Sequence, residues 1–285
     1  MSMRILIVGG NSTLAHALVP VLSQFAEVMT AGRSGCDVRL DLNGEIDAGA
    51  IPRGIDVLIN TAASFGTGDA ARSMYQIEQT NVLGPLRLCQ LCTTLSISHM
   101  VQISSIYAHL TAQSPFYTPY SLSKRHAEEL IGLYSEQTGL ALTVIRPSQF
   151  YGTGPACRKH QPFLYTIIDK VANNENVTIY GSNDARRNFI HLDDVAELTA
   201  AAIRLKITGS HDCAQLQPVR FSDIIAAAAK AFGSRSQMVF MPQQPDIADN
   251  ICPADDTLFR LLRQYPRISL ELGMAKEAAY RKSMQ

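Results

Sequence analysis

A tyrosine and a lysine stand four residues apart in the stretch FYTPYSLSKRHAEEL, residues 116–130. In a helix, Tyr120 and Lys124 would lie on one face, one turn apart. A tyrosine hydroxyl ordinarily has a pKa of about 10, and a neighbouring ammonium group favours tyrosinate and lowers that pKa. The pair could therefore move a proton to or from a substrate oxygen. It could equally be two polar side chains on a solvated helix face, so the surrounding sequence must decide.

A serine at the end of an apolar segment favours the catalytic interpretation. Ser105 closes VQISS, which has the composition of a buried strand, and it precedes Tyr120 by fifteen residues. A hydroxyl in this position can hydrogen-bond a reacting oxygen and orient it toward the tyrosine. The three side chains would suit hydride transfer between a nicotinamide and a carbinol or keto carbon.

A glycine turn near the N-terminus indicates where a dinucleotide could bind. The apolar segment RILIVG runs into GGNSTLAHAL, and Gly9 and Gly10 provide the tight turn that a pyrophosphate site needs. Ser12 and Ala15 stand where glycine is usual, although both are small, and Ser12 can cap the following helix. A plain strand–helix turn is the alternative. The expected cofactor contacts here are Gly9, Asn11, Ser12, Thr13 and Leu14.

Residues at the ends of the next predicted strands are expected to contact the adenosine part of the same dinucleotide. An acidic residue about twenty positions after the first glycine normally binds the ribose of NAD. This chain has Arg33 and Ser34 there, which suit a 2′-phosphate and favour NADP(H) over NAD(H). The alternative for Arg33 is a solvated loop arginine. Further expected cofactor contacts are Asp41, Leu42, Thr61, Ala62 and Ala63.

Composition limits the classes of partner. The 285 residues carry 25 basic and 25 acidic side chains, so no long-range field favours nucleic acid or an anionic membrane. No apolar run reaches the roughly twenty residues needed to span a bilayer, and the N-terminus does not resemble a signal peptide. Six scattered cysteines include Cys89 and Cys92, which we assign to a buried helix face rather than to zinc. We expect a reduced, cytoplasmic protein.

The order of the segments predicts the fold class. Strand-like segments alternate with helical ones through residue 147, which favours an α/β Rossmann-type, doubly wound parallel sheet. We expect one helix over residues 74–95 and a loop over residues 148–162. Residues 1–147, with later returning segments, should form the dinucleotide-binding domain, and most of residues 148–285 a smaller α/β substrate lobe.

Five segments in order resemble the extended branch of the short-chain dehydrogenase/reductase superfamily, the NAD-dependent epimerase/dehydratase family. These are the glycine turn, the strand serine followed by Tyr-x-x-x-Lys, and the segments NVLGPLRL, TVIRPSQFYGTGP and RRNFIHLDDVAEL. The resemblance covers nearly the whole chain. It implies that Ser105, Tyr120 and Lys124 are catalytic, and that Asn81, Ile103, Tyr120, Lys124 and Pro147 line the cofactor. The substrate residues that it implies are Ser64, Ser105, Ile106, Gln149 and Arg187.

Departures from the family narrow the reaction. Dehydratases of this family carry an acidic residue just after the catalytic serine, where this chain has Ile106. A 4,6-dehydratase is therefore not expected, which leaves a 4-epimerase with retained cofactor or a 4-keto reductase. Arg33 favours the reductase, and the general resemblance favours the epimerase.

The substrate features are mixed. Arg187 matches the family arginine that pairs with a nucleotide diphosphate, whereas Gln149 replaces the usual asparagine. A nucleotide-activated sugar is the first expectation. A non-nucleotide carbonyl compound and a catalytically silent dinucleotide-binding module are the alternatives. The resemblance also implies a homodimer, and Asp193 and Asp194 are expected at a helix start rather than at a metal.

Overall fold

The computed structural model describes residues 2–66, 70–252 and 254–284. The chain divides into two compact units, each made of more than one segment. The first unit comprises Met1–Pro147, Ala196–Cys213 and Asp255–Arg263. The second comprises Ser148–Val195, Ala214–Ala254 and Gln264–Gln285.

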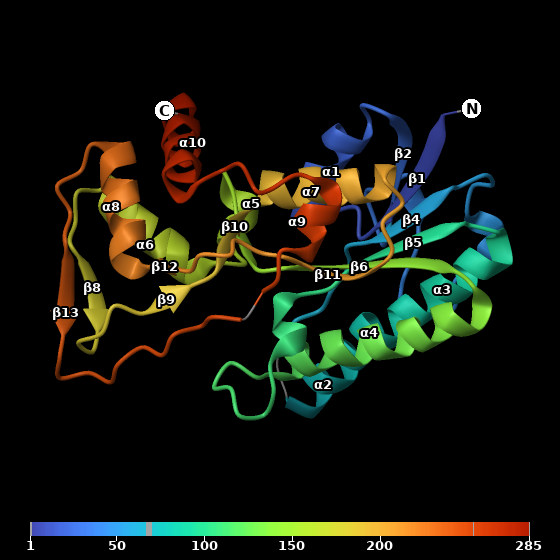
Figure 1. The fold of residues 1–285 in the computed structure, drawn as a ribbon, viewed down its shortest axis with the longest axis horizontal. Helices are drawn as coiled ribbons and strands as arrows, with labels where there is room; N and C mark the ends of the chain where they lie inside the picture. Colours follow the sequence, from blue (N-terminus) through green and yellow to red (C-terminus); the bar gives the residue numbers. More distant parts are fainter. Residues whose placement is uncertain (1, 67–69, 253, 285) are drawn as a thin grey trace. The chain divides into compact units, whose positions relative to one another are not determined.

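A seven-stranded sheet in which every pairing is parallel forms the centre of the first unit (Figure 1). The strands, in spatial order, are β11 (Gly209–Cys213), β6 (Ala141–Pro147), β5 (His99–Ile103), β4 (Val57–Asn60), β1 (Met3–Val8), β2 (Ala26–Gly32) and β3 (Val38–Arg39). All residues of β4 and β5 are buried. Such continuous burial follows because helices cover both faces of a parallel sheet. The predicted Rossmann-type fold class is confirmed.

Helices lie on both faces of this sheet (Figure 1). On one face lie α2 (Ala70–Glu78), α3 (Gly84–Leu95) and α4 (Pro119–Thr138), and on the other α1 (Thr13–Leu22) and the part of α7 (Leu192–Arg204) in this unit. The short helix α9 (Thr257–Leu262) contacts β11. Cys89 and Cys92 are buried on α3, as expected.

Local sequence fixes where α4 begins and ends. Thr118 is the N-cap, its hydroxyl accepts a hydrogen bond from the Ser121 amide, and Pro119 occupies the first turn, where its missing N–H costs nothing. Gly139 ends the helix in the left-handed conformation, with φ 73°. The start of α4 is thus set immediately before Tyr120.

The helix expected over residues 74–95 is present, and it contains an irregular turn. Between α2 and α3 the chain forms a π-helical turn, η2 (Gln79–Leu83), in which the Gly84 amide donates to the Gln79 carbonyl. Pro85 explains this change in hydrogen-bond pattern, because proline has no N–H to donate to the Asn81 carbonyl and its ring crowds that carbonyl. The predicted helix over residues 74–95 is thus confirmed, and the π-helical turn at its centre is a feature that the sequence analysis did not predict.

The second unit is built from short strand pairs and helices. Its paired strands are β7 (Gln149–Tyr151) with β10 (Phe189–His191), β9 (Arg186–Arg187) with β12 (Val219–Arg220), and β8 (Val177–Tyr180) with β13 (Met238–Met241). Its helices are α5 (Pro155–Arg158), α6 (Pro162–Ala172), α8 (Phe221–Phe232) and α10 (Leu270–Ser283), with the start of α7. The loop predicted over residues 148–162 contains β7 and α5, and to that extent the prediction was wrong.

Candidate active site

Tyr120 and Lys124 lie in the first turns of α4 and do not form a solvated face. Lys124 is 2% exposed, and its ammonium nitrogen donates a hydrogen bond to the Ile103 carbonyl at the end of β5, at 3.1 Å. The same nitrogen lies 5.5 Å from the centroid of the Tyr120 ring. The helix and the strand end thus bring the two side chains together at the carboxyl edge of the sheet.

Burial controls the ionisation of both groups. It lowers the pKa of Lys124 from its ordinary 10.5 to about 8, and the Glu128 carboxylate acts in the opposite direction. Burial also raises the pKa of Tyr120, although a hydrogen bond with Ser105 lowers it. The pKa of Tyr120 in the protein alone therefore moves opposite to the sequence-based expectation. The phenol stays protonated at neutral pH, as a proton donor to a keto oxygen requires.

Ser105 lies where β5 turns into the short helix η3 (Ile106–His109). Its hydroxyl caps η3 by accepting a hydrogen bond from the Tyr107 amide at 3.2 Å, and it interacts with Tyr120. Ile106 is 2% exposed, so this position offers neither an acid nor an exposed side chain. His109 pairs with Asp212 at 2.8 Å.

The π-helical turn directs Asn81 toward the loop that follows β4. The Asn81 side chain accepts from the Ser64 amide at 2.7 Å and donates to the Ser64 carbonyl at 2.8 Å and to the Ser123 hydroxyl at 3.0 Å. Asn81 is buried, and its three bonds join this loop to α4. Asn81 thus connects the loop after β4 to the helix that carries Tyr120 and Lys124.

The turn after β1 fits a dinucleotide. Gly9 has φ +83°, and a Cβ there would lie 2.6 Å from the Ala62 nitrogen and 2.8 Å from the Thr61 hydroxyl. Ser12 caps α1 by accepting from the Ala15 amide, and its hydroxyl donates to the Thr61 hydroxyl at 2.9 Å. The turn is followed directly by the N-terminus of α1, which is the arrangement that a pyrophosphate site requires.

The remaining predicted cofactor residues surround this turn. Arg33 is exposed, and no carboxylate in the described part of the chain pairs with it. The loop that carries it is held by Asn11, whose amide donates to the Ser34 carbonyl at 2.7 Å. Asp41 is exposed and accepts from the Asn43 amide. The side chains of Thr13, Leu14, Leu42 and Pro147 are buried, whereas Ala63 is exposed.

Two predicted substrate residues belong to the second unit. Arg187 is 9% exposed; its guanidinium donates to the carbonyls of Arg186 and Ala248 and lies 4.9 Å from the centroid of the Phe221 ring. Gln149 donates to the Gln161 side chain at 3.4 Å, and its own buried carbonyl oxygen has no hydrogen-bond partner among the residues that the structure describes. These contacts orient Arg187 firmly within its own unit.

Asp193 and Asp194 lie in the first turn of α7, as expected. Asp194 accepts hydrogen bonds from the amides of Arg267 and Ile268, and Asp193 pairs with Lys276 at 2.5 Å. Among the described residues, no group of three or more His, Cys, Asp and Glu side chains is arranged to hold a metal. The same part of the chain contains no helix able to cross a membrane.

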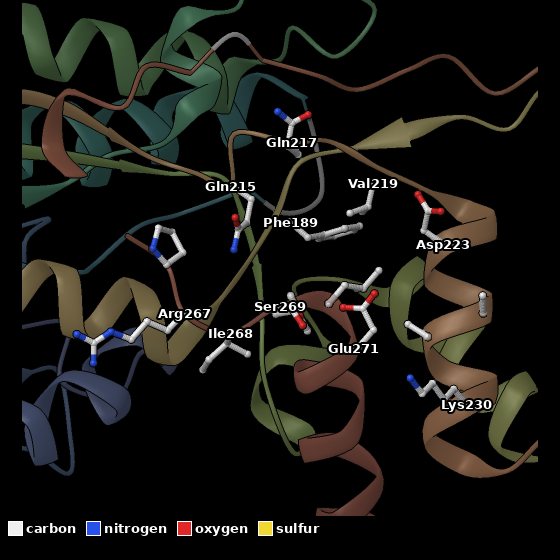
Figure 2. A pocket seen from close by; sticks show the side chains of 15 residues that line it. Phe189, Gln215, Gln217, Val219, Asp223, Lys230, Arg267, Ile268, Ser269 and Glu271 are labelled. Atoms are coloured by element: carbon white, nitrogen blue, oxygen red, sulfur yellow. The ribbon is translucent and has the colours of Figure 1, made fainter. Parts of the chain in front are cut away.

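A groove of about 630 Å³ lies within the second unit, beside α8 and the start of α10 (Figure 2). Its lining carries charges of both signs, from Asp223, Lys230, Arg267 and Glu271. Figure 2 shows the Arg267 guanidinium directed away from Glu271. None of the predicted site residues lines this groove.

Sequence reasoning missed two side chains at the site. Phe65, in the loop after β4, is 60% exposed and stacks on the Tyr120 ring, with centroids 4.5 Å apart. Glu128 is buried one turn beyond Lys124. The four-residue spacing of Tyr120, Lys124 and Glu128 was visible in the sequence and could have identified Glu128. Nothing in the sequence indicated the stacking of Phe65.

Sheet, glycine turn and serine–tyrosine–lysine cluster together define the short-chain dehydrogenase/reductase class. The family model described as NAD dependent epimerase/dehydratase family matches residues 5–212. The chain belongs to this family, and the resemblance found in the sequence is confirmed.

Curated relatives and a solved structure agree with this assignment. The putative UDP-glucose 4-epimerase of Methanocaldococcus jannaschii is 26% identical over 162 residues, 53% of each chain. The UDP-glucuronate 4-epimerase of Thermodesulfobacterium geofontis is 24% identical over 246 residues, 80% of this chain and 73% of the relative. This chain thus spans about half of the first relative's length and nearly three quarters of the second's. The RMD protein of Pseudomonas aeruginosa, complexed with NADPH, shares the fold with a TM-score of 0.80 at 18% identity, over 100% of this chain and 99% of that one.

Proposed function

We propose that this protein catalyses nicotinamide-dependent oxidoreduction at one carbon of a nucleotide-activated sugar, as a 4-epimerase or a 4-keto reductase and not as a 4,6-dehydratase. The observation that carries the proposal is the cluster of Ser105, Tyr120 and Lys124 at the carboxyl edge of the sheet. When bound, the nicotinamide accepts or supplies the hydride. Relatives named as UDP-sugar 4-epimerases support the substrate class.

Each residue of the cluster has one task in this proposal. Ser105 hydrogen-bonds the sugar oxygen and orients it. Tyr120 gives its proton to that oxygen when a keto group is reduced, and takes one when a carbinol is oxidised. Lys124 stabilises the tyrosinate form and holds the cofactor ribose. Ile106 cannot protonate a leaving hydroxyl, which argues against dehydration.

Substitution of Tyr120 by Phe tests the proposal. Because the ring and its stacking on Phe65 are kept and only the hydroxyl is lost, turnover should fall at least about a thousandfold, a loss at the upper end of general acid–base catalysis. Cofactor affinity, measured by fluorescence titration, should change less than about threefold. Full activity in this variant would defeat the mechanism.

Nucleotide binding tests the substrate class separately. Calorimetric titrations with UDP, GDP, CDP and dTDP should give heat with at least one of them, and Arg187→Met should weaken that binding. Heat from none of the four would favour a non-nucleotide carbonyl substrate. Cofactor retained through purification would favour the epimerase, and exchangeable NADPH the reductase.

A further inference from the structure

Glu128 lies at the centre of a buried polar network beside the proposed catalytic cluster. It follows Lys124 by one helical turn, so Tyr120, Lys124 and Glu128 share one face of α4. Its side chain is 8% exposed. A carboxylate so deeply buried on this face needs compensating partners, and the structure supplies them from two strand ends.

The first partner is Ser104, whose hydroxyl donates to the Glu128 carboxylate. Ser104 immediately precedes Ser105, and its amide donates to the Ile145 carbonyl at 2.8 Å. The bond from Ser104 therefore fixes the segment that carries the Ser105 hydroxyl.

The second partner is Arg146, near the end of β6. Its guanidinium donates to both Glu128 oxygens, from Nε at 2.9 and 3.1 Å and from Nη2 at 2.5 Å. Arg146 also pairs with Asp212 at 3.6 Å, and Asp212 pairs with His109 of η3. Removing Glu128 alone would thus leave a partly buried arginine short of one carboxylate.

The negative charge that acts on Lys124 comes from Glu128, and the other groups around this part of α4 have different partners. Of the charged side chains, Glu128 is the one that raises the pKa of Lys124. Tyr107 of η3 acts on Tyr120 instead, and Glu78 of α2 pairs with His126. Arg125 of α4 donates to the carbonyls of Ala108 and Leu110. Two further contacts of α4 are between neutral side chains: Asn81 of η2 bonds Ser123, and Thr93 of α3 bonds Tyr134.

We propose that Glu128 is a positioning residue of the active site, which keeps Lys124 protonated and fixes the strand end that carries Ser105. The inference rests on the proposed oxidoreduction for the role of Lys124. Glu128 does not touch the reacting atoms. It acts through Lys124, whose burial alone would leave it largely uncharged at mildly alkaline pH.

The test is the titration of Lys124 in the full-length protein without substrate. The Cε signal of ¹³C-labelled lysine reports the protonation of each amine, and Lys124→Met identifies the signal of Lys124. Glu128→Gln keeps the side-chain shape and removes the charge, so the Lys124 midpoint should move below the native value of about 8. Glu129→Gln, an exposed neighbour on the same helix, should leave the midpoint unchanged. Glu128→Asp should restore it in part.

A folded Glu128→Gln protein with an unchanged Lys124 midpoint would overturn the proposal and leave Glu128 as a structural partner of Arg146. If this variant does not fold, Glu128→Gln/Arg146→Gln removes the unpaired arginine, and its Lys124 midpoint is compared with that of Arg146→Gln, so that the two proteins differ only in the Glu128 charge. With a sugar substrate, turnover of Glu128→Gln should be about fivefold lower at pH 8, because a pKa lowered by about one unit leaves about a tenth of Lys124 protonated instead of about half. Since the titration needs no substrate, it can succeed even if the proposed function fails.

Discussion

Lys124 is needed in its charged form for the proposed chemistry, but in that form it destabilises the folded protein. A pKa lowered from 10.5 to about 8 means that the fold disfavours the charged amine. The cost is on the order of 3 kcal/mol at neutral pH. It is present in full below pH 8, where both folded and unfolded chains are protonated. As the pH rises from about 8 to about 10.5, the folded protein loses the proton first, and the cost disappears.

Lys124→Met should therefore be more stable than the native protein at pH 7 and inactive. The gain should shrink as the pH rises, because the native protein recovers the cost of charging a buried amine. Thermal unfolding at pH 7 and pH 9.5 measures both differences, and Lys230→Met, on an exposed site of α8, is the control. A stability difference independent of pH would contradict the assigned cause.

Arg33 is the residue that should set cofactor preference. It is exposed beside the glycine turn, and its guanidinium can pair with a 2′-phosphate. Arg33→Ala should weaken NADPH binding about tenfold or more and leave NADH binding nearly unchanged. Fluorescence titration with both cofactors measures this, with the exposed Arg53→Ala as control. If the binding of both cofactors is weakened equally, Arg33 does not pair with the 2′-phosphate.

At the scale of elements, the π-helical turn η2 joins the loop after β4 to α4. It is the place where the helix accommodates Pro85 and where Asn81 faces both Ser64 and Ser123. A regular helix would advance Asn81 differently and aim it away from one of these partners. The irregularity thus holds the loop after β4 against α4.

Asn81→Ala should lower the free energy of unfolding by about 2–3 kcal/mol, because it removes three hydrogen bonds and leaves the amide and carbonyl of half-buried Ser64 without these partners. Turnover should fall with it, since the loop carries Phe65 onto Tyr120. Urea unfolding measures the first effect. Gln90→Ala, an exposed change on α3, should cost much less.

Sequence alone predicted the elements whose signals are local. The strands of a parallel sheet are continuous apolar runs, so β1, β4, β5 and β6 were found, and spacing identified Tyr120 and Lys124. Strand β7 was missed because it pairs with β10 forty residues later, within a stretch rich in Gly and Pro. The pKa direction of Tyr120 was missed because burial is a property of the folded protein.

At the scale of the whole molecule, charge balance has a measurable effect. The formal net charge is zero at pH 7 and the isoelectric point is about 7.0. Repulsion between copies is weakest there, so solubility should be lowest near pH 7 and rise about two pH units to either side. Light scattering of concentrated samples across this range measures the effect. A minimum elsewhere would indicate that bound ions change the net charge.

The strand order of the parallel sheet determines how late in synthesis the sheet can be completed. Strand β11 pairs with β6, and the residues between Pro147 and Gly209 belong mostly to the second unit. While the ribosome synthesises that stretch, β6 remains an unprotected edge, free to pair with another nascent chain. The sheet is completed only when residue 213 has emerged, and its unit only after Arg263. Slow translation through residues 148–208 would prolong this exposed state and favour aggregation.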